Sequence, residues 1–176
     1  MTQQLPATDR NMRFAGRRIY LTGAASGIGR ATAQIMARGG ATLALIDVNE
    51  QGLQAVAAET GGEVLPVDLR DGEAIDRSVE QAAARLGGLD GVVNCAGVPS
   101  GGLIDELPPA EWDRVIAINL SAPYRVCRAA VPWLRRETGG SIVNVASGAG
   151  LLPTGPRAVS PASRRLPASM NSFDQV

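Results

Sequence analysis

The sequence predicts an α/β domain in which a doubly wound parallel sheet is covered by helices on both faces. Three observations lead to this prediction. Short apolar stretches alternate with stretches of helical spacing roughly 10 to 15 residues long, which is typical of βαβ units. Some apolar stretches are uninterrupted, as expected for parallel strands buried on both faces. A glycine-rich turn at residues 22–29 separates the first apolar stretch from the first helical one.

The expected strands cover residues 18–21, 42–47, 63–68, 91–97 (with a turn) and 141–146, and the expected helices cover residues 30–38, 49–58, 71–86 and 111–136. Asn49 is predicted to cap the second helix, and Gly61 with Gly62 is predicted to end it. Pro66 lacks an N–H group, so we expect the third strand at an edge of the sheet. The long last helix is expected to be interrupted near Pro123.

Composition excludes several classes of function. The chain has 176 residues, which suits one α/β domain. Its net charge is zero, so we expect no nucleic-acid partner. The apolar segments have the length of strands and the first residues include no apolar leader, so we expect no membrane span, no signal peptide and a cytoplasmic location. The chain has no histidine, and Cys95 and Cys127 lack metal-ligand spacing, so no metal site is expected.

The glycine-rich turn predicts a site for a dinucleotide. It reads Thr-Gly-Ala-Ala-Ser-Gly-Ile-Gly over residues 22–29, between a strand and a helix. Glycines let the backbone turn tightly and let a pyrophosphate approach, while the helix N-terminus offers free N–H donors. Asp47 follows about 20 residues later, which is the spacing expected for an acid that binds the adenosine ribose.

The spacing T-G-x-x-x-G-x-G resembles that of the short-chain dehydrogenase/reductase family, which comprises nicotinamide-dependent oxidoreductases built on one Rossmann-type domain. The resemblance covers about residues 16–155, and residues 1–15 are expected to form a flexible arm. It implies the strand order 3-2-1-4-5, with the ligand near the switch point between the first and fourth strands. It also implies a homo-oligomer whose dimer contact uses the long helix 111–136 and the helix that follows it in the family.

The resemblance implies NAD as the cofactor. A carboxylate at Asp47 would accept hydrogen bonds from the ribose diol and repel a 2′-phosphate; the alternative is a solvated acid that starts the next helix. Asp68 would contact the adenine amino group, or else serve as a neighbour of a helix cap. The residues implied for the cofactor are Thr22, Gly23, Ser26, Gly27, Ile28, Gly29, Asp47, Asp68, Leu69, Asn94, Ala96 and Gly97.

The segment Asn-Cys-Ala-Gly at residues 94–97 resembles the family's N-N-A-G motif, with Cys95 in place of the second asparagine. In the family this motif stabilises the sheet and passes beneath the cofactor. We expect the Cys95 side chain to face the packed interior.

The resemblance implies two catalytic residues for the interconversion of a secondary alcohol and a ketone. Asn119 would hold a water molecule in a proton relay, or else bond only to the local backbone. Ser147 would hydrogen-bond the substrate oxygen and stabilise developing charge, or else be a turn residue.

The family's Tyr-x-x-x-Lys pair is missing, because Ser160 and Arg164 occupy the corresponding positions. Loss of a general acid/base costs on the order of 10²–10⁴-fold in rate. We therefore expect little or no turnover, and the alternative function is that of a non-catalytic NAD-binding remnant or an oligomerising pseudoenzyme.

Residues 156–176 are rich in Pro, Ser and Arg and show no helical or strand period. The sequence therefore predicts a sheet truncated after its fifth strand, followed by an irregular tail. Because the family pattern breaks within a few residues, we hypothesise a frameshift or a truncated gene model. One of the two other DNA frames beyond codon 155 would then encode Tyr-x-x-x-Lys and further α/β pattern, and the hypothesis fails if neither frame does. The absent helix would also remove the family's dimer contact, so we do not expect this chain to form the homo-oligomer.

Overall fold

Five strands form one parallel sheet in the computed structural model, which describes residues 12–100, 105–135 and 139–147. The order across the sheet is β3-β2-β1-β4-β5, which confirms the order that the resemblance implied. Pro66 ends β3 at one edge of the sheet, as expected. The strands are β1 (Arg18–Thr22), β2 (Thr42–Asp47), β3 (Glu63–Pro66), β4 (Gly91–Asn94) and β5 (Ser141–Asn144).

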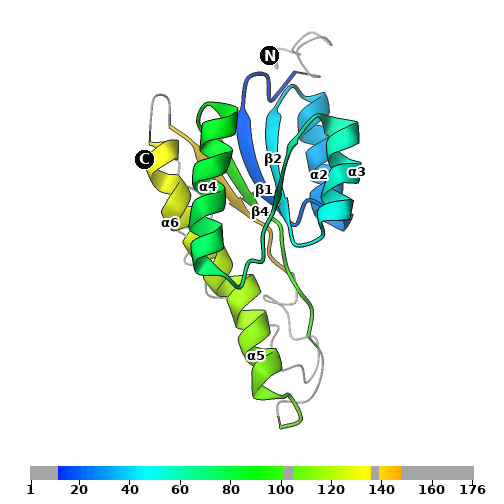
Figure 1. Ribbon diagram of the computed structural model, residues 1–176, viewed down its shortest axis with the longest axis vertical. Coiled ribbons are helices and arrows are strands. Elements are labelled where there is room, and N and C mark those ends of the chain that lie inside the picture. Colours follow the sequence, from blue (N-terminus) through cyan, green and yellow to red (C-terminus); the bar gives the residue numbers. More distant parts are fainter. Residues whose placement is uncertain (1–11, 101–104, 136–138, 148–176) are drawn as a thin grey trace, which may run out of the picture.

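Helices cover both faces of this sheet (Figure 1). α2 (Gly27–Arg38) and α3 (Glu50–Thr60) lie on one face, and α4 (Gly72–Leu86) and α6 (Ala122–Leu134) lie on the other. α5 (Pro109–Ile116) and the π-helical turn η1 (Ala117–Ser121) precede α6. No helix in the described ranges has the length and apolar character needed to cross a membrane.

The alternation of side chains along β1 divides the core into two layers. Tyr20 packs into the cluster beneath α4 and α6, whereas Ile19 and Leu21 pack into the cluster beneath α2 and α3. All three side chains are buried. The Tyr20 hydroxyl and Ser78 Oγ are hydrogen-bonded at 2.7 Å, and burial raises the pKa of this phenol. The central strand is therefore buried on both faces, as its apolar sequence predicts.

The expected helix signals are confirmed around α3. Asn49 Oδ1 accepts a hydrogen bond from Gly52 N at 3.0 Å, which satisfies one of the free N–H groups of the first turn. Gly61 ends the helix with a φ of 71°, a conformation that favours glycine.

The long helix expected over 111–136 differs from the prediction. It begins at Pro109, and η1 interrupts it immediately before α6, whose second residue is Pro123. A π-helical turn arises from i→i+5 hydrogen bonds, which leave no clear mark in the spacing of apolar residues. The third and fifth strands are also shorter than expected, since they end at Pro66 and Asn144 instead of residues 68 and 146.

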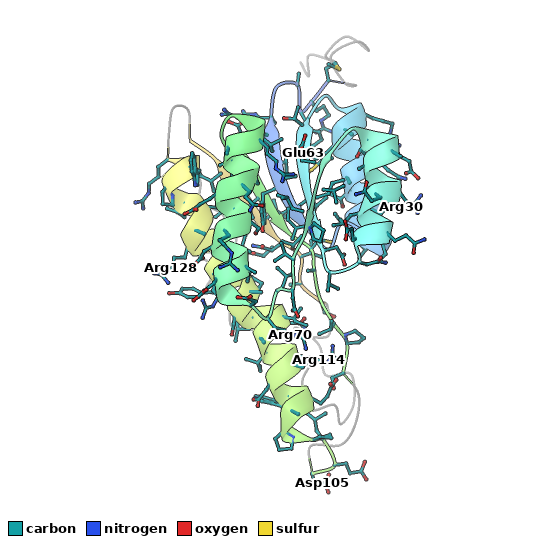
Figure 2. The ribbon with its side chains drawn as sticks, viewed as in Figure 1. Arg30, Glu63, Arg70, Asp105, Arg114 and Arg128 are labelled. Atoms are coloured by element: carbon teal, nitrogen blue, oxygen red, sulfur yellow. The ribbon has the colours of Figure 1, made fainter. Side chains whose placement is uncertain are left out.

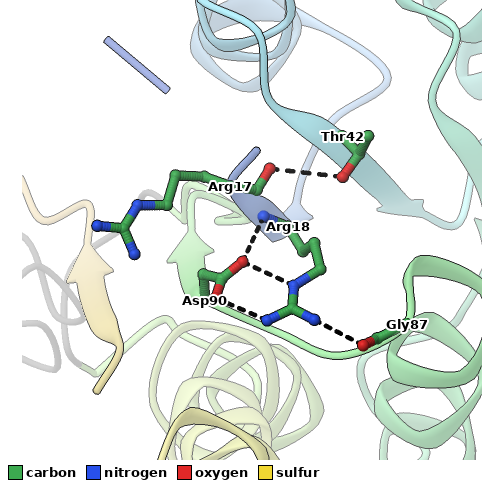
Figure 3. A network of polar contacts seen from close by, with 5 residues as sticks. All are labelled: Arg17, Arg18, Thr42, Gly87 and Asp90. Atoms are coloured by element: carbon green, nitrogen blue, oxygen red, sulfur yellow. Dashed lines mark hydrogen bonds and ion pairs between the residues drawn. The ribbon is translucent and has the colours of Figure 1, made fainter. Parts of the chain in front are cut away.

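A polar network fixes the start of β1 against the segment that precedes β4 (Figure 3). Arg18 donates to Asp90 from its backbone N at 2.9 Å, from Nε at 2.7 Å and from Nη2 at 2.8 Å. Its Nη1 donates to the Gly87 carbonyl at 2.6 Å. On the other side of β1, Thr42 Oγ1 donates to the Arg17 carbonyl at 3.4 Å. The pair of Arg18 and Asp90 therefore joins two neighbouring strands that are distant in sequence.

This pair is expected to make stability depend on pH. Hydrogen bonds from Arg18 lower the pKa of Asp90. Because the folded pKa lies below the unfolded value of about 3.9, the contribution is present above that value and is lost as the pH falls through the folded pKa. Asp90→Asn should lower the free energy of unfolding by about 1–2 kcal/mol at pH 7. In urea titrations the difference from the parent chain should shrink below pH ~4.

Glu73→Gln is the control, because its ion pair with Arg77 is largely exposed and should contribute little at either pH. An Asp90→Asn difference that stays constant with pH would contradict the assignment.

Candidate functional site

A cavity of about 380 Å³ opens at the carboxyl ends of the strands, where the strand order switches between β1 and β4. Open α/β sheets bind ligands at this point. Its walls come from the turns after β1 and β4, the end of β2, the residues after β3, and η1. It is lined by Gly23, Ser26, Gly27, Ile28, Gly29, Asp47, Val48, Val67, Asp68, Leu69, Cys95, Ala96, Gly97, Val98 and Ile118.

The turn after β1 needs its glycines for physical reasons. A Cβ on Gly29 would lie 2.0 Å from the Gly23 carbonyl oxygen, so α2 could not approach the turn with any other residue there. Gly23 has a φ of 69°, and its own Cβ would lie 2.8 Å from the Ala96 backbone. A Cβ on Gly27 would meet no atom within 4 Å, although this residue lines the cavity. A side chain there would occupy space that a ligand could use.

The N-terminus of α2 faces this turn without an anionic partner of its own. Ser26 is the N-cap residue, but its side chain makes no capping hydrogen bond, and the first turn holds no acidic residue. The N–H groups and the positive end of the helix dipole therefore suit a bound phosphate.

Asp47 ends β2 with its carboxylate held by two backbone groups. Oδ2 accepts from Ala25 N at 3.2 Å, and Oδ1 accepts from Asn49 N at 3.0 Å. The first bond ties the end of β2 to the glycine-rich turn. Each carboxylate oxygen can accept a further bond, so the group can present two acceptors to a diol.

Asp68 lines the same cavity beside β3, but its carboxylate is bound to Arg70. It accepts from Arg70 backbone N at 2.9 Å, from Nε at 3.0 Å and from Nη2 at 2.5 Å. These bonds lower the pKa of Asp68. Asp71, rather than Asp68, caps α4, and its Oδ1 accepts from Ala74 N at 3.0 Å.

Two of the expected cofactor residues lie beneath the cavity instead of lining it. Thr22 Oγ1 accepts from Cys95 N at 3.1 Å and from Ala96 N at 3.2 Å, which joins the two turns. Asn94 is buried, and its Nδ2 donates to Asn144 Oδ1 at 2.8 Å. Both residues therefore support the site through the sheet. The expectation for Cys95 holds for only part of its side chain, which packs against the core beneath α2 and α3 and also lines the cavity.

Asn119 lies in η1 and binds the segment after β4. Its Oδ1 accepts from Val98 N at 2.9 Å, and its Nδ2 donates to the Val98 carbonyl at 2.9 Å. The side chain thus binds a backbone segment 21 residues away and not the local backbone of the alternative interpretation, and its role in a proton relay stays a prediction. π-Helical turns occur frequently at functional sites, and η1 fits that tendency.

Ser147 is exposed at the end of the described segment after β5, and it does not line the cavity. Ser160 and Arg164 lie outside the described residues. The structure therefore gathers most of the predicted cofactor residues around one cavity but does not bring Ser147 to it.

Sequence reasoning missed several apolar residues of the cavity wall. Val48 is 71% exposed, which is unusual for such a side chain, while Val67, Val98 and Ile118 also line the cavity. Most of them are sequence neighbours of predicted site residues. Their position directly after a strand was therefore the signal that could have identified them.

Comparison with known proteins places these features in a family context. The family model described as short chain dehydrogenase matches residues 17–165. D-threitol dehydrogenase of Mycolicibacterium smegmatis is 38% identical over 153 residues, covering 84% of this chain and 59% of that protein. The 3-oxoacyl-[acyl-carrier-protein] reductase FabG of Thermotoga maritima is 35% identical over 145 residues, covering 80% of this chain and 59% of that protein.

Solved structures agree with these matches. A short chain dehydrogenase from Burkholderia cenocepacia in complex with NADP has a TM-score of 0.81 at 29% identity, covering 86% of this chain and 64% of that one. A dehydrogenase/reductase from Sinorhizobium meliloti 1021 has a TM-score of 0.80 at 35% identity, covering 85% and 62%. The chain therefore spans about three fifths of the length of these relatives.

Proposed function

Because this chain belongs to the short chain dehydrogenase family, we propose that its cavity binds NAD(H) and that it derives from an oxidoreductase that interconverts a secondary alcohol and a ketone. The observation that carries the proposal is the position of Asp47 beside the glycine-rich turn in the wall of one cavity, with its carboxylate held by Ala25 and Asn49. When bound, the cofactor would supply or accept the hydride.

The residues of the cavity fit such a cofactor. The free N-terminus of α2 suits the pyrophosphate, and the space beside Gly27 lets it approach. Asp47 offers acceptors for the adenosine ribose, while Val48 and Leu69 give apolar contacts for adenine. Among the described residues, no three His, Cys, Asp or Glu side chains are grouped so that they could hold a metal ion.

The preference for NAD rests on charge. Asp47 would repel the 2′-phosphate of NADP, and a juxtaposed like charge costs several kcal/mol. Arg30, in the first turn of α2, is bound to Glu59 of α3, which also accepts from Gln34. That arginine is therefore already neutralised, although the family also includes the NADP-bound relative from Burkholderia.

For this chain as it stands we propose weak or absent turnover. Ser160 and Arg164 replace the acid/base pair of the family, and the hydroxyl of Ser160 is far less acidic than a phenol. This substitution favours the second candidate function, a nucleotide-binding remnant without chemistry. For the parent enzyme, the relative named D-threitol dehydrogenase supports a small alcohol or the matching carbonyl compound as substrate, and the relative named 3-oxoacyl-[acyl-carrier-protein] reductase supports reduction of a carbonyl group.

Titration of the purified 176-residue chain with NADH, followed by nucleotide fluorescence, tests the proposal. We expect saturable NADH binding, NADPH binding weaker by at least about tenfold, and no loss of NADH absorbance with a panel of ketones. A folded chain that binds neither nucleotide would contradict the proposed function. Steady NADH oxidation would instead refute the remnant and support an active enzyme.

A further inference from the structure

α5 lies apart from the layers of the sheet. It projects beyond the carboxyl ends of the strands, on the side of the cavity (Figure 1). Of the residues of α5, Val115 is buried, and it belongs to neither of the two core clusters in the described structure. α5 therefore adds little to the two core layers. Its position calls for an explanation other than core packing.

Arg114 of α5, labelled in Figure 2, makes two kinds of contact. Its Nε and Nη2 each donate to Glu111, to Oε2 and Oε1 respectively, at 2.8 Å. The same Nη2 also donates to the Pro99 carbonyl at 3.2 Å. Glu111 therefore fixes the planar guanidinium in one orientation, from which it reaches the segment after β4.

The contact with Pro99 restrains a segment that is already held at its neighbour. Proline has no N–H group, so the carbonyl is its one backbone hydrogen-bonding group. Asn119 binds both the N–H and the carbonyl of Val98. Together, Arg114 and Asn119 hold residues 98–99 by three bonds from α5 and η1, and Gly97 and Val98 line the cavity.

The topology decides which part of the cofactor this segment would meet. Asp47 at the end of β2 would hold the adenosine ribose, and the turn after β1 would hold the pyrophosphate. β4 lies on the opposite side of β1 from β2. The remaining half of the dinucleotide, which carries the nicotinamide, would therefore extend over Gly97 and Val98.

We propose that Arg114 is a positioning residue, which holds the segment after β4 in the shape that accepts the nicotinamide half of the cofactor. This inference rests on the proposed function, because it concerns the same cavity. It separates two parts of one ligand: the adenosine and pyrophosphate part should not depend on Arg114, whereas the nicotinamide part should.

Isothermal titration calorimetry on the full 176-residue chain tests this with NADH and with ADP, which ends at the pyrophosphate. Arg114→Met should weaken NADH about tenfold and leave ADP affinity within about twofold. Arg114→Lys keeps a cation that can reach the Pro99 carbonyl, and it should recover part of the lost NADH affinity. Arg77→Met is the matched control, since Arg77 pairs with Glu73 on the exposed face of α4, and it should change neither affinity.

Each other outcome overturns the proposal. Unchanged NADH affinity in Arg114→Met would show that the segment keeps its shape without the arginine. Equal weakening of NADH and ADP would indicate a general structural role. If the parent chain binds ADP but not NADH, the segment does not receive the nicotinamide half; if it binds neither, the proposed function itself fails and this inference fails with it.

Discussion

Gly29→Ala is expected to abolish nucleotide binding and to lower the free energy of unfolding by about 3 kcal/mol or more. The added Cβ would lie 2.0 Å from the Gly23 carbonyl oxygen and 2.7 Å from the Gly23 carbonyl carbon. Both are backbone atoms of a turn that Thr22 also ties to the segment after β4, so they cannot move aside cheaply. Urea unfolding followed by circular dichroism, together with NADH titration, measures both effects.

Gly61→Ala is the matched control for this prediction. Gly61 has a φ of 71°, but a Cβ there would meet no atom within 4 Å, and the residue does not line the cavity. The change should cost about 1–2 kcal/mol from backbone strain alone and should leave NADH affinity unchanged. If Gly29→Ala lowers the free energy of unfolding and NADH affinity no more than Gly61→Ala does, then the close approach of α2 to the turn does not require glycine at position 29.

Asp47→Asn is expected to weaken NADH binding about 10- to 100-fold and to remove the preference over NADPH. The amide keeps the size of the side chain but loses the negative charge, so it accepts weaker hydrogen bonds from the ribose diol and no longer repels a 2′-phosphate. One of the two carboxylate oxygens becomes an NH2 donor, so either Ala25 N or Asn49 N loses its acceptor, which should lower the free energy of unfolding by about 1 kcal/mol. Parallel fluorescence titrations with NADH and NADPH give the ratio.

Asp76→Asn removes the same charge from the exposed face of α4 and should leave both affinities unchanged. If the Asp47→Asn variant still binds NADH more tightly than NADPH, the preference arises from another part of the cavity and not from the charge of Asp47.

The sequence predicted the elements whose signals are local. The apolar run of β2 was predicted with its observed bounds, because every residue from Leu43 to Ile46 is buried between two layers of helices. The cap at Asn49 and the end of α3 at Gly61 were predicted for the same reason: each depends on a side chain or backbone conformation within its own turn. The strand order came from the family resemblance and not from these local patterns.

Other features depend on contacts that no local pattern records. The π-helical turn η1 changes the hydrogen-bonding register around Asn119 without changing the apolar spacing. The pairing of Asp68 with Arg70 depends on the rotamer of a long exposed side chain. Arg114 looked like any charged residue on a helix, and its contact with Pro99 appears only when the two segments are placed side by side.

The bond between Thr22 and Cys95 has a consequence for the order in which this chain folds. Ala25 and Asp47, which meet on the side of the cavity that we propose for adenosine, are 22 residues apart, whereas Thr22 and Cys95 are 73 residues apart. The entropy lost on closing a loop grows with its length, by about 0.6 kcal/mol for each doubling. We therefore expect β1 to pair first with β2 and only later with β4, so that the adenosine side forms before the other wall. A dinucleotide that spans both walls would bind only after β1 has paired with β4, which joins the residues most distant in sequence. Its binding energy would therefore stabilise the strand pairing that we expect to form most slowly.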